Sequence, residues 1–369
     1  MTDSSTRARI LVLIKGLGIG GAETLIADAA PIWDHGTFEY KVAYMLPWKD
    51  QLRSQIEAAG VEVIDLDWRG ATSTGGPRNL RQLYRGFNPD LVHSHLPAAG
   101  VAARLLLPRP AHVYTEHNLV GHYRHPTRLL NRLTYARNSA VIAVSQAVAH
   151  SVSGYPGPRP LVIPNGVRAD VARENPADVR RELGLANGTR LVVHVGNIRP
   201  YKGHSNLIAA TRDLSANHAD VLVVSIGGEK RHGDLERLKV EASSAGLDGK
   251  IRFLGRRPDA RAYIAAADCV VNPSDVEGFP VVLLEALAIG RPVVATSVGG
   301  VSDVVRHEET GLLVPPGDPA ALAQAIGRCL ESPDASSWAR NGRELVLAEY
   351  GLEKMVAGYE TVYRDVLGI

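Results

Sequence analysis

Short apolar runs recur along the chain, and each is followed by a stretch with the composition of a helix. The first series comprises residues 10–14, 42–46, 61–66, 91–93, 112–115 and 141–144, and the second comprises 191–195, 221–226, 251–254, 269–271 and 293–295. Apolar runs without strict alternation are typical of strands buried on both faces of a parallel sheet, and the intervening helices indicate βαβ units. The pattern therefore predicts an α/β protein with two Rossmann-like parallel sheets.

The two series are separated by a segment rich in turn-forming residues. Asn175-Pro176, Gly184 and Asn187-Gly188 interrupt the apolar pattern between Pro164 and Gly188. We place an interdomain linker there, so that the first domain covers residues 1–168 and the second begins at residue 169. A chain of 369 residues agrees with two domains of about 150 residues each.

Composition excludes several classes of protein. Hydrophobic residues make up 45% and charged residues 22%, which argues against a disordered, collagenous or coiled-coil chain. Cys269 and Cys329 form no Cys-x-x-Cys pair, so neither a disulfide framework nor a zinc knuckle is indicated. The first apolar run, of five residues, is too short for a signal sequence or a membrane span. These observations favour a cytoplasmic protein.

Charge is distributed unevenly along the chain. The whole sequence has 41 Lys and Arg against 39 Asp and Glu, a balance unlike that of a dedicated nucleic-acid binder. Residues 1–168 carry 18 basic and 12 acidic residues, whereas the remainder carries 23 and 27. The near-neutral total therefore leaves room for an anionic partner on the first domain.

Glycines follow the first apolar run. Residues Gly16 to Gly21 match the pattern G-x-G-x-x-G of dinucleotide-binding proteins. One hypothesis that rests on this match is a nicotinamide-dependent oxidoreductase. The acidic residue expected after the second strand is missing, because Val42–Leu46 continues into Pro47-Trp48-Lys49. Two interpretations stay open, a phosphate or acceptor contact at Gly20 and Gly21, or a purely structural turn.

Histidines mark the ends of two other strands. His93 and His95 lie on one face of their strand, and His117 follows the next strand in the sequence Glu116-His117-Asn118. No cysteine or carboxylate set completes a metal site around them, so hydrogen bonding to a substrate is favoured over buried structural histidines. Asp65-Leu66-Asp67 fits a metal-binding Asp-x-Asp pattern, but without a second acidic cluster we interpret it as a solvated strand end.

The first strand of the second domain leads into a loop with two cations. This loop, Gly196-Asn197-Ile198-Arg199-Pro200-Tyr201-Lys202-Gly203, places Arg199 and Lys202 three residues apart before a helix. Arg grips phosphate oxygens with two bonds, Lys adds a point charge, and the helix start adds a positive dipole end. A diphosphate site is the favoured interpretation, and ordinary exposed loop cations are the alternative.

Two glutamates eight residues apart enclose an apolar helix. Glu277 precedes Gly278, Phe279 and Pro280 in the loop, and Glu285 lies among apolar helical positions. A buried carboxylate without a partner is costly, and the hydroxyl pair of a ribose is one suitable partner for Glu285. The segment Ser297-Val298-Gly299-Gly300-Val301 repeats the combination of a glycine turn and a helix start.

Together these motifs resemble the retaining glycosyltransferases of family 4, which have the GT-B fold of two Rossmann-like parallel-sheet domains facing across a cleft. The resemblance covers essentially the whole length. It rests on Gly20-Gly21-Ala22-Glu23, Ile163-Pro164-Asn165-Gly166-Val167, the Arg199 and Lys202 loop, Glu277 and Glu285, and Gly311-Leu312-Leu313-Val314-Pro315-Pro316-Gly317-Asp318. One departure is Asp303, which stands where the family often has Glu.

The resemblance implies roles for individual residues. Arg199 and Lys202 are expected to neutralise the donor diphosphate, Glu285 to hold the ribose, and Glu277 to face the donor sugar. The expected donor site also includes Gly20, Gly21, Gly196, Asn197, Leu254, Gly278, Phe279 and Pro280. The expected acceptor site comprises His95, His117 and Asn118, with His117 near the reacting centre. The second domain then ends at residue 349, and a helix over residues 350–369 returns to the first.

The implied reaction moves a sugar from a nucleotide diphosphate sugar to a hydroxyl acceptor with retention, by same-face substitution and with neither metal nor cofactor. The acceptor is a glycan, a lipid-linked molecule or a small molecule, and no nucleic acid is involved. A sugar-nucleotide epimerase of similar architecture remains an alternative. Release of free nucleotide only when an acceptor is present would favour transfer over epimerisation.

One basic helix of the first domain has no role in that scheme. Arg124, Arg128 and Arg132 recur every four residues beside Leu129, Leu130 and Leu133, which predicts an amphipathic helix. Three interpretations stay open: a solvated face, contact with a charged acceptor, or docking of a cytoplasmic protein to the inner face of an anionic membrane.

Overall fold

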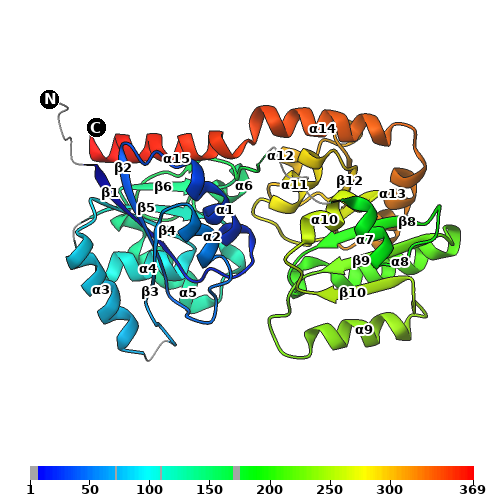
Figure 1. Cartoon of the computed structure of the whole chain (residues 1–369), viewed down its shortest axis with the longest axis horizontal. Coiled ribbons are helices and arrows are strands. Elements are labelled where there is room, and N and C mark those ends of the chain that lie inside the picture. The colour runs from blue at the N-terminus through cyan, green and yellow to red at the C-terminus, as the bar shows by residue number, and fades with distance from the viewer. Residues whose placement is uncertain (1–6, 71–72, 109, 169–174) are drawn as a thin grey trace. The chain divides into compact units, whose positions relative to one another are not determined.

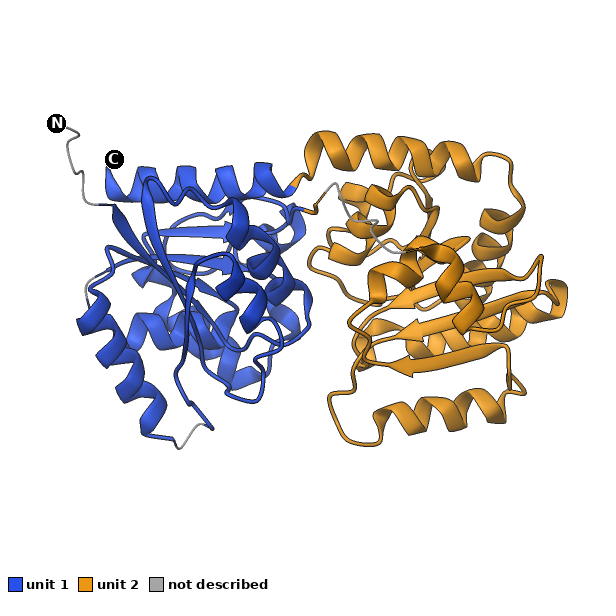
Figure 2. Ribbon diagram, in the orientation of Figure 1, with its two compact units in different colours: residues 1–166, 352–369 blue, residues 167–351 orange. Residues whose placement is uncertain are grey.

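The chain folds into two compact units, residues 1–166 with 352–369 and residues 167–351 (Figure 2). The computed structural model describes residues 7–70, 73–108, 110–168 and 175–369. Each unit contains one sheet, of seven strands in the first and six in the second, and its paired strands run parallel (Figure 1). The predicted α/β class with two Rossmann-like sheets is confirmed.

Unit 1 has the strand order β3-β2-β1-β4-β5-β6-β7. Its elements are β1 (Ala8–Ile14), α1 (Gly21–Ala29), η1 (Ala30–Ile32), β2 (Phe38–Tyr44), α2 (Arg53–Ala58), β3 (Glu62–Asp65), α3 (Gly75–Phe87), β4 (Leu91–His95), α4 (Pro97–Leu106), β5 (Ala111–Glu116), η2 (Val120–His122), α5 (His125–Thr134), η3 (Tyr135–Arg137), β6 (Ala140–Ala143), α6 (Gln146–Ser151), β7 (Leu161–Val162) and α15 (Leu352–Leu367). Leu11, Leu13 and Val92 pack with α3 and α4, so Val12 and His93 face the opposite side.

The last helix, α15 (red in Figure 1), completes that opposite side of unit 1. Tyr363 Oη lies 2.5 Å from His93 Nδ1, and the Tyr363 ring meets Phe38 edge to face. Glu360 Oε1 accepts hydrogen bonds from the Asp34 backbone N–H at 2.7 Å and from Tyr40 Oη at 3.0 Å. The end of the chain is therefore part of the core of unit 1.

Unit 2 has the strand order β10-β9-β8-β11-β12-β13. Its elements are α7 (Pro176–Glu182), β8 (Arg190–Val195), η4 (Pro200–Lys202), α8 (His204–Asn217), β9 (Val221–Ile226), α9 (Asp234–Ser244), β10 (Ile251–Gly255), α10 (Ala260–Ala266), β11 (Cys269–Asn272), α11 (Val281–Ile289), β12 (Val293–Thr296), α12 (Val301–Val304), β13 (Leu312–Val314), α13 (Pro319–Glu331) and α14 (Ala335–Glu349). Its main core joins Val192, Val223, Val271 and Val294 of the sheet to α8, α9 and α13.

The structure differs from the sequence prediction mainly in short or edge elements. Two further strands, β7 and β13, are only two and three residues long. Strand β2 begins at Phe38 rather than at Val42, and Phe38 to Lys41 alternate between buried and half-buried. The predicted linker contains α7, and its residues 169–174 lie outside the described residues. Among the helices described, none has the length and apolar character needed to cross a bilayer.

Candidate functional site

Three loops lie together at the carboxyl edge of the sheet of unit 2. They follow β8, β11 and β12, which are neighbours in the strand order, so the parallel topology delivers all three to one edge. The Asp275 N–H donates to the Tyr201 carbonyl at 2.9 Å, which ties the β8 loop to the β11 loop. The Gly300 N–H donates to the Gly278 carbonyl at 3.1 Å, which ties in the β12 loop. We call these segments, residues 196–203, 273–280 and 297–300, the three-loop junction.

Two glycines allow the three-loop junction to close. Gly203 has a φ of +69°, and a Cβ there would lie 1.8 Å from the Pro273 carbonyl oxygen. Gly299 has a φ of +53°, and a Cβ there would lie 1.7 Å from the Glu277 carbonyl oxygen. Both positions combine a left-handed backbone with an approach too close for any side chain. The spacing between the loops thus depends on glycine.

Replacing Gly299 with alanine is expected to displace the Glu277 loop and lower kcat/KM about ten-fold, because the new Cβ collides with backbone. The matched control is Gly246→Ala, where φ is +72° but nothing lies within 4 Å of the added carbon. It bears only the backbone strain of about 1 kcal/mol and should leave kcat/KM unchanged. Steady-state kinetics of both variants tests this, and equal activity of the two would contradict the role of Gly299.

Lys202 and Glu277 meet inside the three-loop junction. Lys202 Nζ donates to Glu277 Oε1 at 2.7 Å, and their side chains are 24% and 8% exposed. The same Oε1 accepts from Ser274 Oγ at 2.7 Å and from Asn272 Nδ2 at 3.2 Å. Within the described part of the chain, Glu277 Oε2 accepts no hydrogen bond. One oxygen of the carboxylate is therefore held by the protein, and the other is available to a ligand.

Arg199 is the second cation of the β8 loop. It precedes η4, is partly exposed, and forms no ion pair or hydrogen bond through its guanidinium with any described residue. Its neighbour Asn197 has a structural contact, because Asn197 Oδ1 accepts from the Gly228 N–H at 3.0 Å. Arg199 is therefore the freer of the two cations, whereas Lys202 already neutralises a carboxylate.

Glu285 lies on α11, one turn beyond the start of the helix. Its Oε1 accepts from Arg261 Nε of α10 at 2.8 Å, and its side chain is 12% exposed. The sequence indicates that this acid needs a partner and suggests a ribose, and the structure supplies Arg261 from the chain itself. Nearby, Phe279 is buried and its ring lies 5.6 Å from that of Tyr350. Leu254 is the half-buried fourth residue of β10, and Pro280 immediately precedes α11.

Unit 1 contains a buried cluster of histidines between the sheet and α15. His95 Nδ1 and His117 Nε2 lie 3.0 Å apart, and the His93 ring lies 4.1 Å from that of His95. His93 Nε2 lies 2.7 Å from Thr115 Oγ1. Burial lowers the pKa of His117 to about 4 and that of His93 to about 3, and it also lowers the pKa of His95. These imidazoles are therefore neutral at pH 7 and act through hydrogen bonds.

The histidine cluster lines a small cavity of about 20 Å³ together with Tyr359, Tyr363 and apolar residues of α1. His117 is 9% exposed, and Asn118 beside it is partly exposed. His93 is fully engaged by Tyr363 and Thr115, so its position is that of a structural histidine. His95 and His117 are thus the histidines of this cluster with bonding capacity left for a substrate.

Glu116, the last residue of β5, is a buried acid on the face of that strand opposite Thr115. Glu116 accepts hydrogen bonds from Tyr114 Oη at 2.8 Å and from Tyr123 Oη, and Asn131 Nδ2 of α5 donates to it at 3.4 Å. Asn131 Oδ1 in turn accepts from Arg104 Nη2 at 2.6 Å. Burial raises the pKa of Glu116 to about 7. This network anchors α5 directly behind the loop that carries His117.

The remaining sequence candidates have simpler surroundings. Gly20 and Gly21 lie at the start of α1, where a Cβ on Gly20 would lie 2.6 Å from Glu23 Oε2. Asp65 closes a turn by accepting from the Asp67 N–H at 2.7 Å, and Asp67 pairs with Arg69 at 2.7 Å. No cluster of three or more His, Cys, Asp or Glu suited to hold a metal ion occurs in the described ranges.

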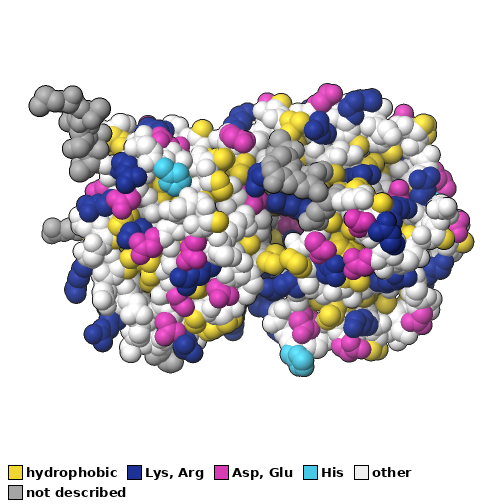
Figure 3. All heavy atoms as spheres, viewed as in Figure 1, with side chains coloured by type: hydrophobic (Ala, Val, Ile, Leu, Met, Phe, Trp, Pro, Cys, Tyr) yellow, Lys and Arg dark blue, Asp and Glu magenta, His cyan; other side chains and the backbone are white. Residues whose placement is uncertain are grey.

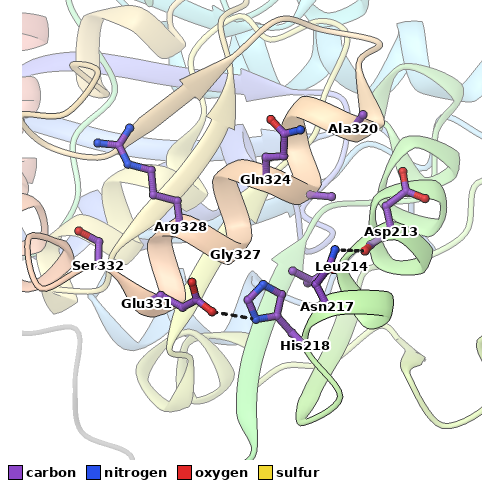
Figure 4. Close-up of a pocket in the computed structure, with 11 residues that line it drawn as sticks. Asp213, Leu214, Asn217, His218, Ala320, Gln324, Gly327, Arg328, Glu331 and Ser332 are labelled. Atoms are coloured by element: carbon purple, nitrogen blue, oxygen red, sulfur yellow. Dashed lines mark hydrogen bonds and ion pairs between the residues drawn. The ribbon is translucent and has the colours of Figure 1, made fainter.

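A larger cavity, of about 670 Å³, lies elsewhere in unit 2, between α8 and α13 (Figure 4). Figure 4 shows His218 and Glu331 on opposite walls, with His218 Nδ1 3.3 Å from Glu331 Oε1. None of the residues that the sequence nominates lines this cavity. Two of its charged side chains already have ionic partners, since Arg328 pairs with Glu308 and Asp213 pairs with Arg212. Size alone therefore does not identify the site.

Sequence reasoning missed several residues of these sites. Asn272 and Ser274 hold Glu277, and their signal is that one polar residue ends a buried strand and another follows it two positions later. Arg261 comes from another helix, and nothing in the pattern pairs it with Glu285. The pattern around His117 gives Glu116 no role of its own, although an acid that ends an apolar strand is itself a signal for a buried network.

Two family models match most of the chain. The one described as "Glycosyl transferases group 1" matches residues 177–345, and the one described as "Glycosyltransferase Family 4" matches residues 19–171. A D-inositol 3-phosphate glycosyltransferase of Corynebacterium glutamicum is 33% identical over 84% of this chain and 79% of its own length. A protein of the same name from Corynebacterium jeikeium is 34% identical over 68% of this chain and 66% of its own length. The chain thus spans about two thirds of the length of that relative.

Solved structures resemble the whole chain. HepE of Anabaena, in complex with UDP and glucose, has a TM-score of 0.85 and 25% identity, and the match covers 97% of this chain and 100% of HepE. A sucrose-phosphate synthase of Thermosynechococcus elongatus has a TM-score of 0.83, and the match covers 98% of this chain and 99% of the synthase. At 23% identity this likeness supports the fold alone. The GT-B fold is shared by these neighbours.

Proposed function

The chain belongs to the glycosyltransferase family whose models are group 1 and family 4, and on that premise we propose that it moves a sugar from a nucleotide diphosphate sugar to a hydroxyl acceptor. Unit 2 carries the donor site and unit 1 the acceptor site. The acceptor is a glycan, a lipid-linked molecule or a small molecule bearing a free hydroxyl.

One observation carries the proposal, namely the arrangement of Arg199, Lys202 and Glu277 in the three-loop junction. Arg199 has no carboxylate partner within the described residues, and Lys202, which pairs with Glu277, keeps 24% of its side chain exposed. The two cations meet the charge that develops on the departing diphosphate. Glu277 Oε2 accepts a hydroxyl of the donor sugar, while Oε1 keeps Lys202 in position. Glu285 holds the ribose, in competition with Arg261.

The histidines of unit 1 serve the acceptor. His117 is neutral at pH 7 and is oriented by its contact with His95, so it hydrogen-bonds the acceptor hydroxyl without adding a charge. Because the cations stabilise the leaving group, the reaction needs no metal ion, and it proceeds with retention by same-face substitution through an oxocarbenium-like state. The donor approaches Gly20 and Gly21 as well. We place the enzyme in the cytoplasm, consistent with its two free cysteines.

Thermal unfolding in the presence of UDP, GDP and ADP tests the donor class. One of these nucleotides should raise Tm, because a ligand that binds only the folded state stabilises it by mass action. UDP is the first choice, since HepE was solved with UDP. A transfer assay then follows release of nucleotide with and without an acceptor extract. Nucleotide release that does not depend on the acceptor would count against transfer. An unchanged Tm with all three nucleotides would contradict the proposed donor site.

Replacing Glu285 with alanine should weaken donor nucleotide binding about ten-fold or more, because a charged hydrogen bond to the ribose is lost. Arg261→Ala is the matched control, since it breaks the same 2.8 Å ion pair and leaves the carboxylate in place. It should retain or improve affinity. Calorimetric titration of both variants decides the matter, and an equal loss in both would assign Glu285 a structural role only.

A further inference from the structure

Helix α5 of unit 1 presents its apolar side chains to solvent. Leu129, Leu130 and Leu133 are 54%, 46% and 68% exposed. The buried residues of the helix are the polar Asn131 and Thr134. A surface helix ordinarily buries its apolar stripe, so α5 has the reverse orientation. We define the α5 face as Leu129, Leu130 and Leu133 together with Arg128 and Arg132.

The buried polar network holds α5 in this orientation. Asn131 bridges two buried charged side chains, accepting from Arg104 at 2.6 Å and donating to Glu116 at 3.4 Å. Arg104 is 3% exposed and Glu116 is fully buried. Rotating the helix to bury its leucines would leave these groups without partners, which is costly inside a protein. The exposure of the leucines is therefore built into the fold.

Basic residues accompany the exposed leucines, and acidic residues are absent from this part of the sequence. Residues 117–168 contain six arginines and neither Asp nor Glu, so they carry the entire positive excess of the first 168 residues. Arg124, Arg128 and Arg132 form no ion pair with a carboxylate of the described chain. On the face drawn in Figure 3, basic and acidic side chains are interspersed.

The helix geometry places both kinds of side chain on one surface. Asn131 and Thr134 define the inward side of α5, and at 100° per residue Leu129 and Leu133 project to the opposite side. Arg128 and Arg132 lie on one flank of Leu129, about 90° and about 130° from the inward side, and Leu133 and Leu130 lie on its other flank. Long arginine side chains in that position reach the same plane as the leucines.

We propose that the α5 face docks unit 1 on the surface of an anionic lipid bilayer. Leucines enter the boundary between headgroups and acyl chains while the arginines contact lipid phosphates, the combination that interfacial helices use. A nucleic acid would match the arginines but leave the leucines in water. A protein partner would need acidic residues beside an apolar groove. The docking does not depend on the proposed transfer reaction and is tested apart from it.

Flotation of the full-length protein with vesicles tests the proposal. Vesicles of phosphatidylcholine alone are compared with vesicles that also contain phosphatidylglycerol, at low and high salt. The protein should float with the anionic vesicles at low salt, and high salt should release it, because counterions screen the arginines. Recovery in the bottom fraction with both vesicles, or equal flotation with both, would overturn the proposal.

Paired variants separate the two contributions. Arg128→Gln/Arg132→Gln and Leu129→Ser/Leu133→Ser should each reduce the bound fraction about ten-fold, while Tm stays unchanged because none of the four side chains is buried. Arg81→Gln/Arg85→Gln on the exposed side of α3 removes the same charge from the same unit and should leave flotation unchanged. If the α3 variant lost as much of its vesicle-bound fraction as the α5 variants, binding would depend on net charge rather than on the α5 face.

A second copy of the chain is the other occupant that the leucines suit. Light scattering after size exclusion measures this directly. If the wild type is a dimer that Leu129→Ser/Leu133→Ser converts to a monomer, and flotation is unaffected by that change, the α5 face is a subunit interface and the membrane proposal fails. A mass that is the same in wild type and variant, with flotation lost in the variant, supports it.

Discussion

Replacing Lys202 with alanine is expected to lower kcat/KM about a thousand-fold, because in the proposed reaction the departing diphosphate loses a fixed cation in a preorganised site. The same change should also cost about 2 kcal/mol of folding stability, because the Glu277 carboxylate, 8% exposed, keeps only Asn272 and Ser274 as partners. Steady-state kinetics and thermal unfolding measure the two losses separately. A fall in Tm with unchanged kcat/KM would make Lys202 purely structural.

Arg199→Ala is the comparison that separates these losses. Arg199 belongs to the same loop and has the same charge, but no described residue pairs with it, so its removal should reduce kcat/KM and leave stability within about 0.5 kcal/mol. A second comparison is Lys202→Ala/Glu277→Gln. Neutralising the buried carboxylate should restore most of the stability without restoring activity. Recovery of activity in the double variant would contradict the proposed contact with the diphosphate.

Acidification from about pH 7 to about pH 5 is expected to lower folding stability, with a net loss of about 4 kcal/mol from His93, His117, His204 and Glu116 together. Burial lowers the pKa of His93 to about 3 and of His117 and His204 to about 4, from an ordinary value of 6.5. The unfolded chain therefore binds more protons than the folded chain below pH 6.5. The stability these residues contribute is present above pH 6.5 and is lost as the pH falls, by about 2 kcal/mol each at pH 5.

Glu116 opposes this trend. Its pKa rises to about 7 from an ordinary value of 4.5, so its contribution to stability is complete below pH 4.5 and is lost as the pH rises through 7. As the pH falls from 7 to 5, protonation of Glu116 adds about 2 kcal/mol to folding stability, and the net loss given above includes this gain. Chemical denaturation across this pH range measures the slope. In Glu116→Gln the loss on acidification should be steeper, and equal stability of the wild type at pH 7 and pH 5 would contradict the burial of the neutral histidines.

The sheets were predictable because their signal is local. Largely apolar runs such as Leu191–Val195 and Val221–Ile226 are typical of strands buried on both faces of a parallel sheet, and both are strands. The short edge strands β7 and β13 lack that signal, since two or three residues establish no pattern. The β8 loop was recognisable because glycine, Arg and Lys follow a strand end, where the parallel topology places ligands.

Partners distant in sequence were beyond prediction. Periodicity identifies α5 as amphipathic, but it does not reveal that the polar side faces inward, because that depends on Arg104 and Glu116 from two other elements. The apolar surroundings of Glu285 in the sequence indicate that it needs a partner, yet the choice between a ribose and Arg261 depends on how α10 packs against α11. In both cases a side chain 15 or more residues away decides what a local pattern means.

The return of α15 to unit 1 has a consequence for biosynthesis. His93 and Tyr363 are 270 residues apart, and the whole of unit 2 lies between them in the sequence. A ribosome therefore releases all of unit 2 before the helix that covers Phe38 and His93 exists. Until then the nascent unit 1 exposes apolar surface, the condition under which chains associate wrongly or require a chaperone. Unit 2, which is continuous, completes its own core first.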